Sequence, residues 1–161
     1  MHSMTVDLGP PVGTKAPDFS LPEDINTTLT LSELVKSKPV LLLFYVADFG
    51  MICSVEMKTF QKRFSEFDPI CQLIGISTNS IRSHGSWSIG LKLSFPLLSD
   101  LEMRVCQDWG VLVEDGTFMD GLAYRSAFLV DPDMIIRFKW VPDDPSYEPD
   151  YDQLLAEVRK L

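Results

Sequence analysis

The feature that most constrains the fold of this chain is an unbroken apolar run, Val40–Ala47, in its first third. Its eight residues fall far short of the roughly 18 that a membrane-spanning helix requires. Apolar character that is continuous rather than alternating is typical of a strand covered on both faces of a sheet. We therefore expect Val40–Val46 to form a central strand with other elements packed above and below it.

Helical and strand patterns alternate after this run. From Cys53 to Phe67 apolar residues recur at steps of three and four, which predicts an amphipathic helix of about four turns. Residues 71–77 resemble a second buried strand. Two further strand segments flank the turn signal Asp131-Pro132-Asp133 and predict an antiparallel hairpin, 124–130 with 134–140.

The remaining segments complete the predicted architecture. Prolines up to Asn26 favour an extended lead-in with turns. We expect further helices over four stretches, 30–36, 80–91, 101–109 and 151–161. A strand–helix–strand start and a hairpin–helix end predict an α/β chain with a thioredoxin-like fold, in which a central mixed β-sheet is flanked by helices.

Length and charge limit the classes of function. The 161 residues show no shift in composition and no repeat, so we expect one domain, 1–161. A formal net charge of −9 repels phosphate backbones and anionic lipids, so nucleic acid and membrane are not expected partners. With no secretory signal visible at the N-terminus, the expected compartment is the cytoplasm. Glycine-rich nucleotide loops and clustered metal ligands are absent from the sequence, so we expect no cofactor and no metal.

Cys53 is the first candidate for chemistry, because it stands where the central strand has ended and the long helix begins. Free amide groups and the positive end of the helix dipole favour a thiolate at such a position. Arg125 lies in an otherwise apolar strand segment, where a buried guanidinium needs an anionic partner such as a thiolate or Glu56. The alternatives are a buried, inert Cys53 and an Arg125 that faces water at a sheet edge.

The other two cysteines and the histidines favour structural interpretations. Cys71 and Cys106 lie in apolar surroundings, and no Cys-x-x-Cys pair exists, which argues against a dithiol exchanger. His84 would pair with Cys53 in a cysteine hydrolase, but its Ser-Gly-Ser setting favours a surface or capping histidine. We therefore treat Cys53 as the one candidate nucleophile.

Several motifs occur together between Val12 and the C-terminus. In chain order they are Val12–Phe19, Leu42–Tyr45, Asp48-Phe49, Cys53-x-x-Glu56, the spacing Ser80, His84 and Trp87, Phe95–Asp100, and Arg125 with Phe128 and Asp131. Taken together, these motifs resemble the peroxiredoxins of the alkyl hydroperoxide reductase and thiol-specific antioxidant family.

The resemblance implies a thiol peroxidase whose peroxidatic cysteine is Cys53. Its thiolate would attack a peroxide oxygen to give a sulfenic acid. Arg125 would hold the thiolate and the peroxide, and Glu56 would orient the arginine. The substrate would lie against Val46, Gly50 and Ile52, where the backbone amides of residues 52 and 53 meet the developing charge.

Two positions depart from the family pattern. Val46 stands in place of a proline that shields the thiolate, and Gly50 in place of a threonine or serine whose hydroxyl positions the peroxide. One such donor is worth about 10² to 10³ in rate, so we expect reduced peroxidase efficiency. The alternative function is a peroxiredoxin-like redox sensor or interaction protein with weak or no turnover.

The resemblance also implies partners. Cys71 and Cys106 match none of the usual resolving positions, which favours a one-cysteine scheme. The reductant would be an external thiol, either a thioredoxin-like or glutaredoxin-like protein or a small thiol. The peroxide would be hydrogen peroxide or an alkyl hydroperoxide, and the protein would form a homodimer.

Overall fold

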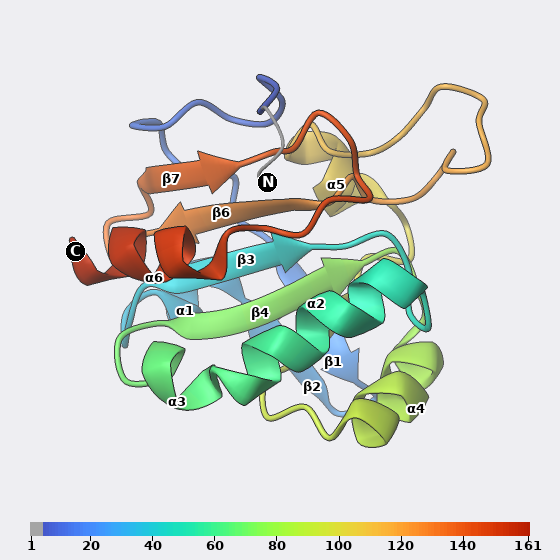
Figure 1. The fold of residues 1–161 in the computed structure, drawn as a ribbon, viewed down its shortest axis with the longest axis horizontal. Coiled ribbons are helices and arrows are strands. Elements are labelled where there is room, and N and C mark those ends of the chain that lie inside the picture. The colour runs from blue at the N-terminus through green and yellow to red at the C-terminus, as the bar shows by residue number, and fades with distance from the viewer. Residues whose placement is uncertain (1–4) are drawn as a thin grey trace.

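A central five-stranded sheet organises the molecule, and the computed structural model describes residues 5–161 (Figure 1). The strand order is β5-β4-β3-β6-β7. β3 is parallel to β4 and antiparallel to β6, so the sheet is mixed as predicted. The strands span Val40–Phe44 (β3), Gln72–Ser77 (β4), Leu97–Ser99 (β5), Ser126–Val130 (β6) and Ile136–Trp140 (β7).

β3 lies at the centre of this sheet, as its continuous apolar sequence predicts. Its side chains alternate between two buried layers, with Leu41 and Leu43 in one core cluster and Leu42 and Phe44 in the other. All five residues of β3 are buried. A strand covered on both faces has no polar side to show in its sequence.

Helices cover both faces of the sheet (Figure 1). One core cluster draws on α2, α3, α4 and α6, and the other on α1, α5 and the N-terminal strands. The bounds are Leu31–Leu34 (α1), Met51–Lys62 (α2), Phe64–Phe67 (α3), Ile81–Leu91 (α4), Arg104–Asp108 (α5) and Tyr151–Arg159 (α6). Within residues 5–161, none of these helices has the length and apolar character needed to cross a bilayer.

The structure corrects three predicted elements. The lead-in expected up to Asn26 ends in a strand, β1 (Ser20–Asp24), which forms an antiparallel hairpin with β2 (Thr27–Thr30). The helix expected over 53–67 begins two residues earlier, at Met51, and is interrupted at Arg63, whose φ of −101° separates α2 from α3. The helix expected over 101–109 forms only over α5. Apolar spacing continues across Arg63 into α3, so periodicity alone does not reveal the break.

Candidate active site

The turn from β3 into α2 places Cys53 in the first turn of a twelve-residue helix. Gly50 is the N-cap of α2 and provides no side-chain cap. The amides of residues 51–53 therefore have no partner within the helix, and together with the helix dipole they favour negative charge at this end. The Cys53 thiol lies at this positive end and is 2% exposed.

Arg125 reaches Cys53 because β6 pairs with β3. Ser126 lies opposite Phe44 in this antiparallel pair, so the residue before β6 lies beside the end of β3 that leads to α2. The Arg125 guanidinium donates to Cys53 Sγ at 3.3 Å and to Glu56 Oε1 at 2.6 Å. Its Nε donates to the Pro145 carbonyl at 2.6 Å. The side chain is 2% exposed, which excludes the alternative of a water-facing arginine.

In this cluster, burial and the neighbouring charges shift the pKa values of Glu56 and Arg125 in opposite directions. Burial raises the pKa of the Glu56 carboxyl to about 7, although the neighbouring Arg125 charge lowers it. Burial lowers the pKa of Arg125, but Glu56 and Cys53 outweigh that effect and leave it above its ordinary value. A guanidinium that donates to a carboxyl and a thiol stays charged, and its positive charge favours negative charge on both partners.

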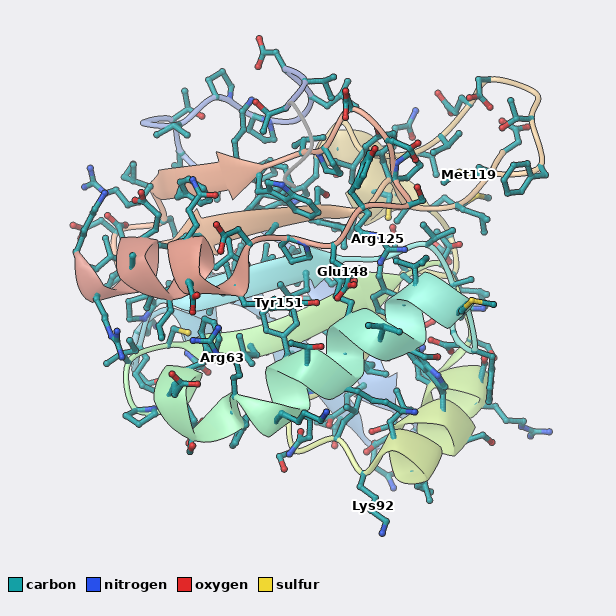
Figure 2. The ribbon with its side chains drawn as sticks, viewed as in Figure 1. Arg63, Lys92, Met119, Arg125, Glu148 and Tyr151 are labelled. Atoms are coloured by element: carbon teal, nitrogen blue, oxygen red, sulfur yellow. The ribbon has the colours of Figure 1, made fainter. Side chains whose placement is uncertain are left out.

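A cavity of about 290 Å³ opens at this cluster and includes all the residues expected to contact substrate. Val46, Gly50 and Ile52 line it beside Cys53 and Arg125. Apolar side chains make up most of the cavity wall. One of them, Met119, lies on the long loop that precedes β6 (Figure 2). The wall includes Phe118, Met119 and the segment 144–146, which sequence reasoning did not single out.

The segment that leads into α6 closes the site on another side. Figure 2 shows Arg125, Glu148 and Tyr151 in the region between this segment and α2. The Tyr151 hydroxyl donates to Glu148 Oε1 at 2.6 Å, and the charge of Glu148 adds to the rise in the pKa of Glu56. The polar loop 143–150 gave no sequence signal for this role, because its contacts with Arg125 depend on tertiary packing.

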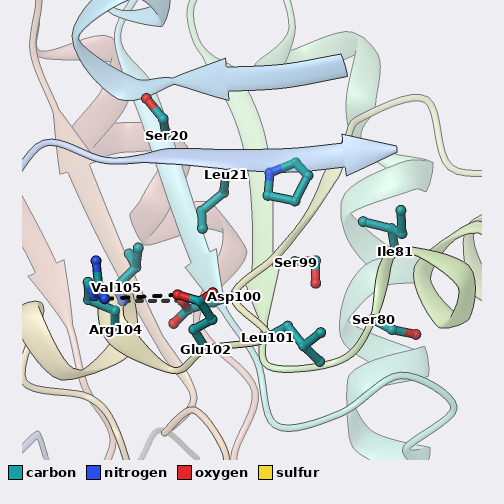
Figure 3. A pocket seen from close by; sticks show the side chains of 11 residues that line it. Ser20, Leu21, Ser80, Ile81, Ser99, Asp100, Leu101, Glu102, Arg104 and Val105 are labelled. Atoms are coloured by element: carbon teal, nitrogen blue, oxygen red, sulfur yellow. Dashed lines mark hydrogen bonds and ion pairs between the residues drawn. The ribbon is translucent and has the colours of Figure 1, made fainter. Parts of the chain in front are cut away.

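Cys71 and Cys106 lie in the core and not at this cavity, as the sequence predicts. Both are fully buried, and burial raises the pKa of the Cys71 thiol to about 12 and that of Cys106 further. A larger cavity of about 460 Å³ lies elsewhere, between β1, the start of α4 and residues 99–105 (Figure 3). Asp100 on its wall accepts from the amides of Val105 and Cys106, so its carboxylate is used by the fold.

His84 is not the surface or capping histidine that its neighbours in the sequence suggested. It is 2% exposed and contacts Asp48 and Tyr45 as well as the Leu98 carbonyl. The sequence carried one signal that His84 is buried. The apolar Trp87 follows it at a helical step of three and lies on the same buried face of α4. Within residues 5–161, no group of three or more potential ligand side chains is arranged to bind a metal ion.

Comparison with known proteins agrees with the geometry of this site. The model of the AhpC/TSA family matches residues 12–139, which is most of the chain. The chain belongs to this family and is a peroxiredoxin. A 2-cysteine chloroplastic peroxiredoxin of Chattonella marina var. antiqua is 33% identical, over 93% of this chain and 80% of the relative. Peroxiredoxin-2 of Bos taurus is 32% identical, over 83% of this chain and 70% of the relative.

The fold of the peroxiredoxin agrees with solved relatives. The crystal structure of peroxidoxin BcpB from Mycobacterium tuberculosis superposes with a TM-score of 0.82 at 28% identity, covering 93% of this chain and 97% of that one. The predicted thioredoxin-like fold is confirmed, and the protein is a thiol peroxidase by family. Several chloroplastic plant relatives are longer, and the chain spans only 51% to 64% of their length.

Proposed function

We propose that this peroxiredoxin reduces peroxides with Cys53 as the nucleophile, Arg125 as the residue that holds thiolate and substrate, and Glu56 as the residue that orients Arg125. One observation carries the proposal: Arg125 donates to both Cys53 Sγ and Glu56 Oε1 at the free N-terminus of α2. Fixed donors at a buried thiolate lower the barrier to attack, because they stabilise charge without reorganising.

The chemical step follows from these groups. Cys53 Sγ attacks one peroxide oxygen, an S–O bond forms and the O–O bond breaks. The departing oxygen takes a proton and leaves as water or, from an alkyl hydroperoxide, as an alcohol. The amides of Ile52 and Cys53 and the Arg125 guanidinium contact the oxygen on which negative charge develops. The apolar wall of the cavity also suits the organic part of an alkyl hydroperoxide.

Two positions in the fold support a one-cysteine scheme. Cys106 belongs to the core cluster on the face of the sheet opposite to Cys53. Cys71 precedes β4, which runs parallel to β3, whereas Cys53 follows the other end of β3. The six residues of β4 therefore separate the two thiols by on the order of 20 Å along the sheet.

An external thiol would complete the cycle. A first thiol condenses with the Cys53 sulfenic acid to form a mixed disulfide and water, and a second thiol releases the reduced enzyme. A thioredoxin-like or glutaredoxin-like protein or a small thiol would serve, which fits the cytoplasm, where such thiols are kept reduced. We also propose a homodimer, on the strength of the family alone.

Stopped-flow mixing of the reduced protein with hydrogen peroxide tests the proposal. The expected result is oxidation far faster than that of a free cysteine, with mass spectrometry locating one added oxygen on Cys53. Cys53→Ser should lose peroxidase turnover, whereas Cys71→Ser and Cys106→Ser should keep it. Turnover that survives in Cys53→Ser would overturn the assigned nucleophile. A stoichiometric disulfide from Cys53 to either other cysteine would overturn the one-cysteine scheme.

A redox sensor with little turnover is the second candidate, and Gly50 favours it. The cavity wall at Gly50 has no hydroxyl to orient the peroxide. Under this alternative Cys53 would still form a sulfenic acid, but at a rate close to that of a free cysteine. The same stopped-flow rate therefore distinguishes the two functions.

A further inference from the structure

A buried polar cluster beside the active site takes no part in the chemistry described above. We call it the Asp48–His84 cluster, and it consists of Tyr45, Asp48, Ser83 and His84. Tyr45 and Asp48 belong to the segment between β3 and α2, and the other two belong to α4. The side chains of His84 and Asp48 are 2% and 0% exposed. Ionisable groups so deeply buried must be paired and hydrogen-bonded.

Both ring nitrogens of His84 face hydrogen-bond acceptors. Nε2 lies 3.0 Å from the Leu98 carbonyl oxygen, which can only accept, so Nε2 carries a hydrogen. Nδ1 lies 2.7 Å from Asp48 Oδ2, 3.0 Å from Oδ1 and 3.2 Å from the Tyr45 hydroxyl, whose hydrogen is directed to Asp48. The Asp48–His84 pair therefore holds one further proton, on either the carboxyl or Nδ1.

The donors around Asp48 decide where that proton lies. The Tyr45 hydroxyl donates to Asp48 Oδ1 at 2.6 Å, and the Ser83 hydroxyl donates to Oδ2 at 2.7 Å. Burial and the neighbouring Asp48 raise the pKa of Tyr45 well above its ordinary value, so Tyr45 remains a donor. Two hydroxyl donors favour an ionised carboxylate. The shared proton then belongs on Nδ1, which makes His84 an imidazolium.

The elements packed around His84 bring further polar groups near its ring. Glu23 and Asp24 of β1 line a cavity that His84 also lines. From β5, the Leu98 carbonyl contacts the His84 ring. From α4, the Ser83 hydroxyl donates to the Asp48 carboxylate, which is also hydrogen-bonded to His84. Of these groups, the Asp48 carboxylate contacts the ring directly and stabilises a positive imidazole.

Asp48 connects this cluster to Cys53 through the loop 46–50. The Asp48 amide donates to Asn79 Oδ1 at 2.9 Å, and the ring of Phe49 packs against Trp87 with centroids 6.3 Å apart. Phe49 has a φ of +66°, a conformation that an L residue keeps only where its surroundings hold it. Gly50 follows directly and caps α2, so the anchors of the loop also set the position of the first turn of α2.

We infer that His84 is a positioning residue, held as an imidazolium, which fixes the loop 46–50 through Asp48 and so aligns the Cys53 thiolate with Arg125. The inference rests on the proposed function of Cys53. His84 touches neither the thiol nor the cavity at Cys53, and it acts only through the loop.

The protonation of His84 is measured directly by nitrogen NMR of the reduced protein with ¹⁵N-labelled histidine. The chain has two histidines, and His2→Gln leaves His84 as the single imidazole. The expected result at pH 7.5 is a proton on each ring nitrogen of His84. A spectrum with only one protonated ring nitrogen would overturn the inference. This measurement leaves the whole active site unchanged and does not depend on peroxide activity.

The positioning role is tested by the pH at which Cys53 becomes a thiolate, followed by ultraviolet absorbance. His84→Gln and Asp48→Asn should each move that midpoint to higher pH and slow oxidation of Cys53 by on the order of tenfold to a hundredfold. Ser86→Ala, at an exposed position on α4, is the matched control and should leave both unchanged. Variants that lose thermal stability but keep the wild-type midpoint would show a structural role only and overturn the inference.

The two readouts separate this inference from the proposed function. A wild-type protein that does not react with peroxide would refute the peroxidase proposal, while the thiolate midpoint would still report whether His84 positions Cys53. A wild-type protein that reacts rapidly, with unchanged midpoints in His84→Gln and Asp48→Asn, would keep the peroxidase proposal and refute the role of His84.

Discussion

At the scale of single residues, Gly50 is the clearest departure from the family pattern. Its φ of −64° and ψ of 145° are open to any residue, so the backbone does not require glycine. A Cβ at this position would lie 3.5 Å from Cys53 Sγ and 3.2 Å from the Ala47 carbonyl oxygen. The second contact is tight but requires a shift of only a few tenths of an ångström. A small hydroxyl side chain therefore fits beside the thiolate.

Gly50→Ser should raise the rate of Cys53 oxidation by up to about 10², because it supplies a donor next to the reacting oxygen. Stopped-flow oxidation by hydrogen peroxide measures this change. Gly50→Ala is the matched control, since it adds the same Cβ without a hydroxyl. Equal rates for the serine and alanine variants would contradict the expectation and show that the first-turn amides and Arg125 already suffice.

Glu56 should give the stability of the protein a distinctive dependence on pH. Burial raises the pKa of its carboxyl from 4.5 to about 7 on folding. The unfolded chain therefore loses this proton first, so the contribution of Glu56 to stability is fully present below pH 4.5 and is lost as pH rises through 7. Glu56→Gln should remove this decline.

Urea unfolding of the wild type and Glu56→Gln at several pH values between 5 and 7 measures the effect. The free energy of unfolding of the wild type should fall relative to that of the variant across this interval. Glu157→Gln, at a residue of α6 that pairs with Lys160 away from the cavity, is a suitable control. Parallel curves for wild type and Glu56→Gln would show that Arg125 fully offsets the burial of the carboxylate.

At the scale of elements, the C-terminus of α4 carries a local strain. Lys92 is its C-cap and has a φ of +56°, in the left-handed region that favours glycine. Its side chain projects into solvent at the edge of the molecule (Figure 2). Because this side chain is exposed, its packing offsets little of the cost of the backbone conformation.

Lys92→Gly should stabilise the protein by about 0.5–1 kcal/mol, because glycine relieves the left-handed strain at a small cost in unfolded-state entropy. The midpoint of urea unfolding measures this gain. Lys92→Ala removes the same side chain but keeps a Cβ, so it should bring no comparable stabilisation. A stabilised alanine variant would instead assign the effect to the lysine charge.

Elements with a strong periodic or continuous apolar pattern were predictable, and short polar ones were not. β3, β4 and the hairpin of β6 and β7 have such patterns, as does α6. The hairpin of β1 and β2 does not, because only Leu21 among its residues is buried. The three-residue strand β5 is too short to show periodicity and forms because β4 provides a partner edge.

At the scale of the whole molecule, access to the active-site cavity should divide the three buried cysteines into two kinetic classes. Cys53 lines this cavity at the positive end of α2, whereas Cys71 and Cys106 lie in the core with raised thiol pKa values. Alkylation of the native protein by iodoacetamide at pH 7.5 should therefore modify Cys53 first. The other two should react only through global unfolding, at a rate that rises with added urea.

Mass spectrometry of peptides after timed alkylation checks this prediction. Denatured protein, in which all three thiols are exposed, provides the reference rates. Labelling of Cys71 or Cys106 at a rate insensitive to denaturant would reveal a local opening of the core. It would also weaken the case for a one-cysteine scheme.

The sequence by itself determined the mixed sheet, the central strand and the position of Cys53 at a helix N-terminus, because these depend on local pattern and composition. Only the tertiary structure decided that Arg125 meets Glu56 and Cys53, which lie 69 and 72 residues away in the chain, since that contact requires β6 to pair with β3. It also decided that His84 is buried against Asp48. Contacts between distant segments depend on strand order and register, which a local pattern of side chains does not encode.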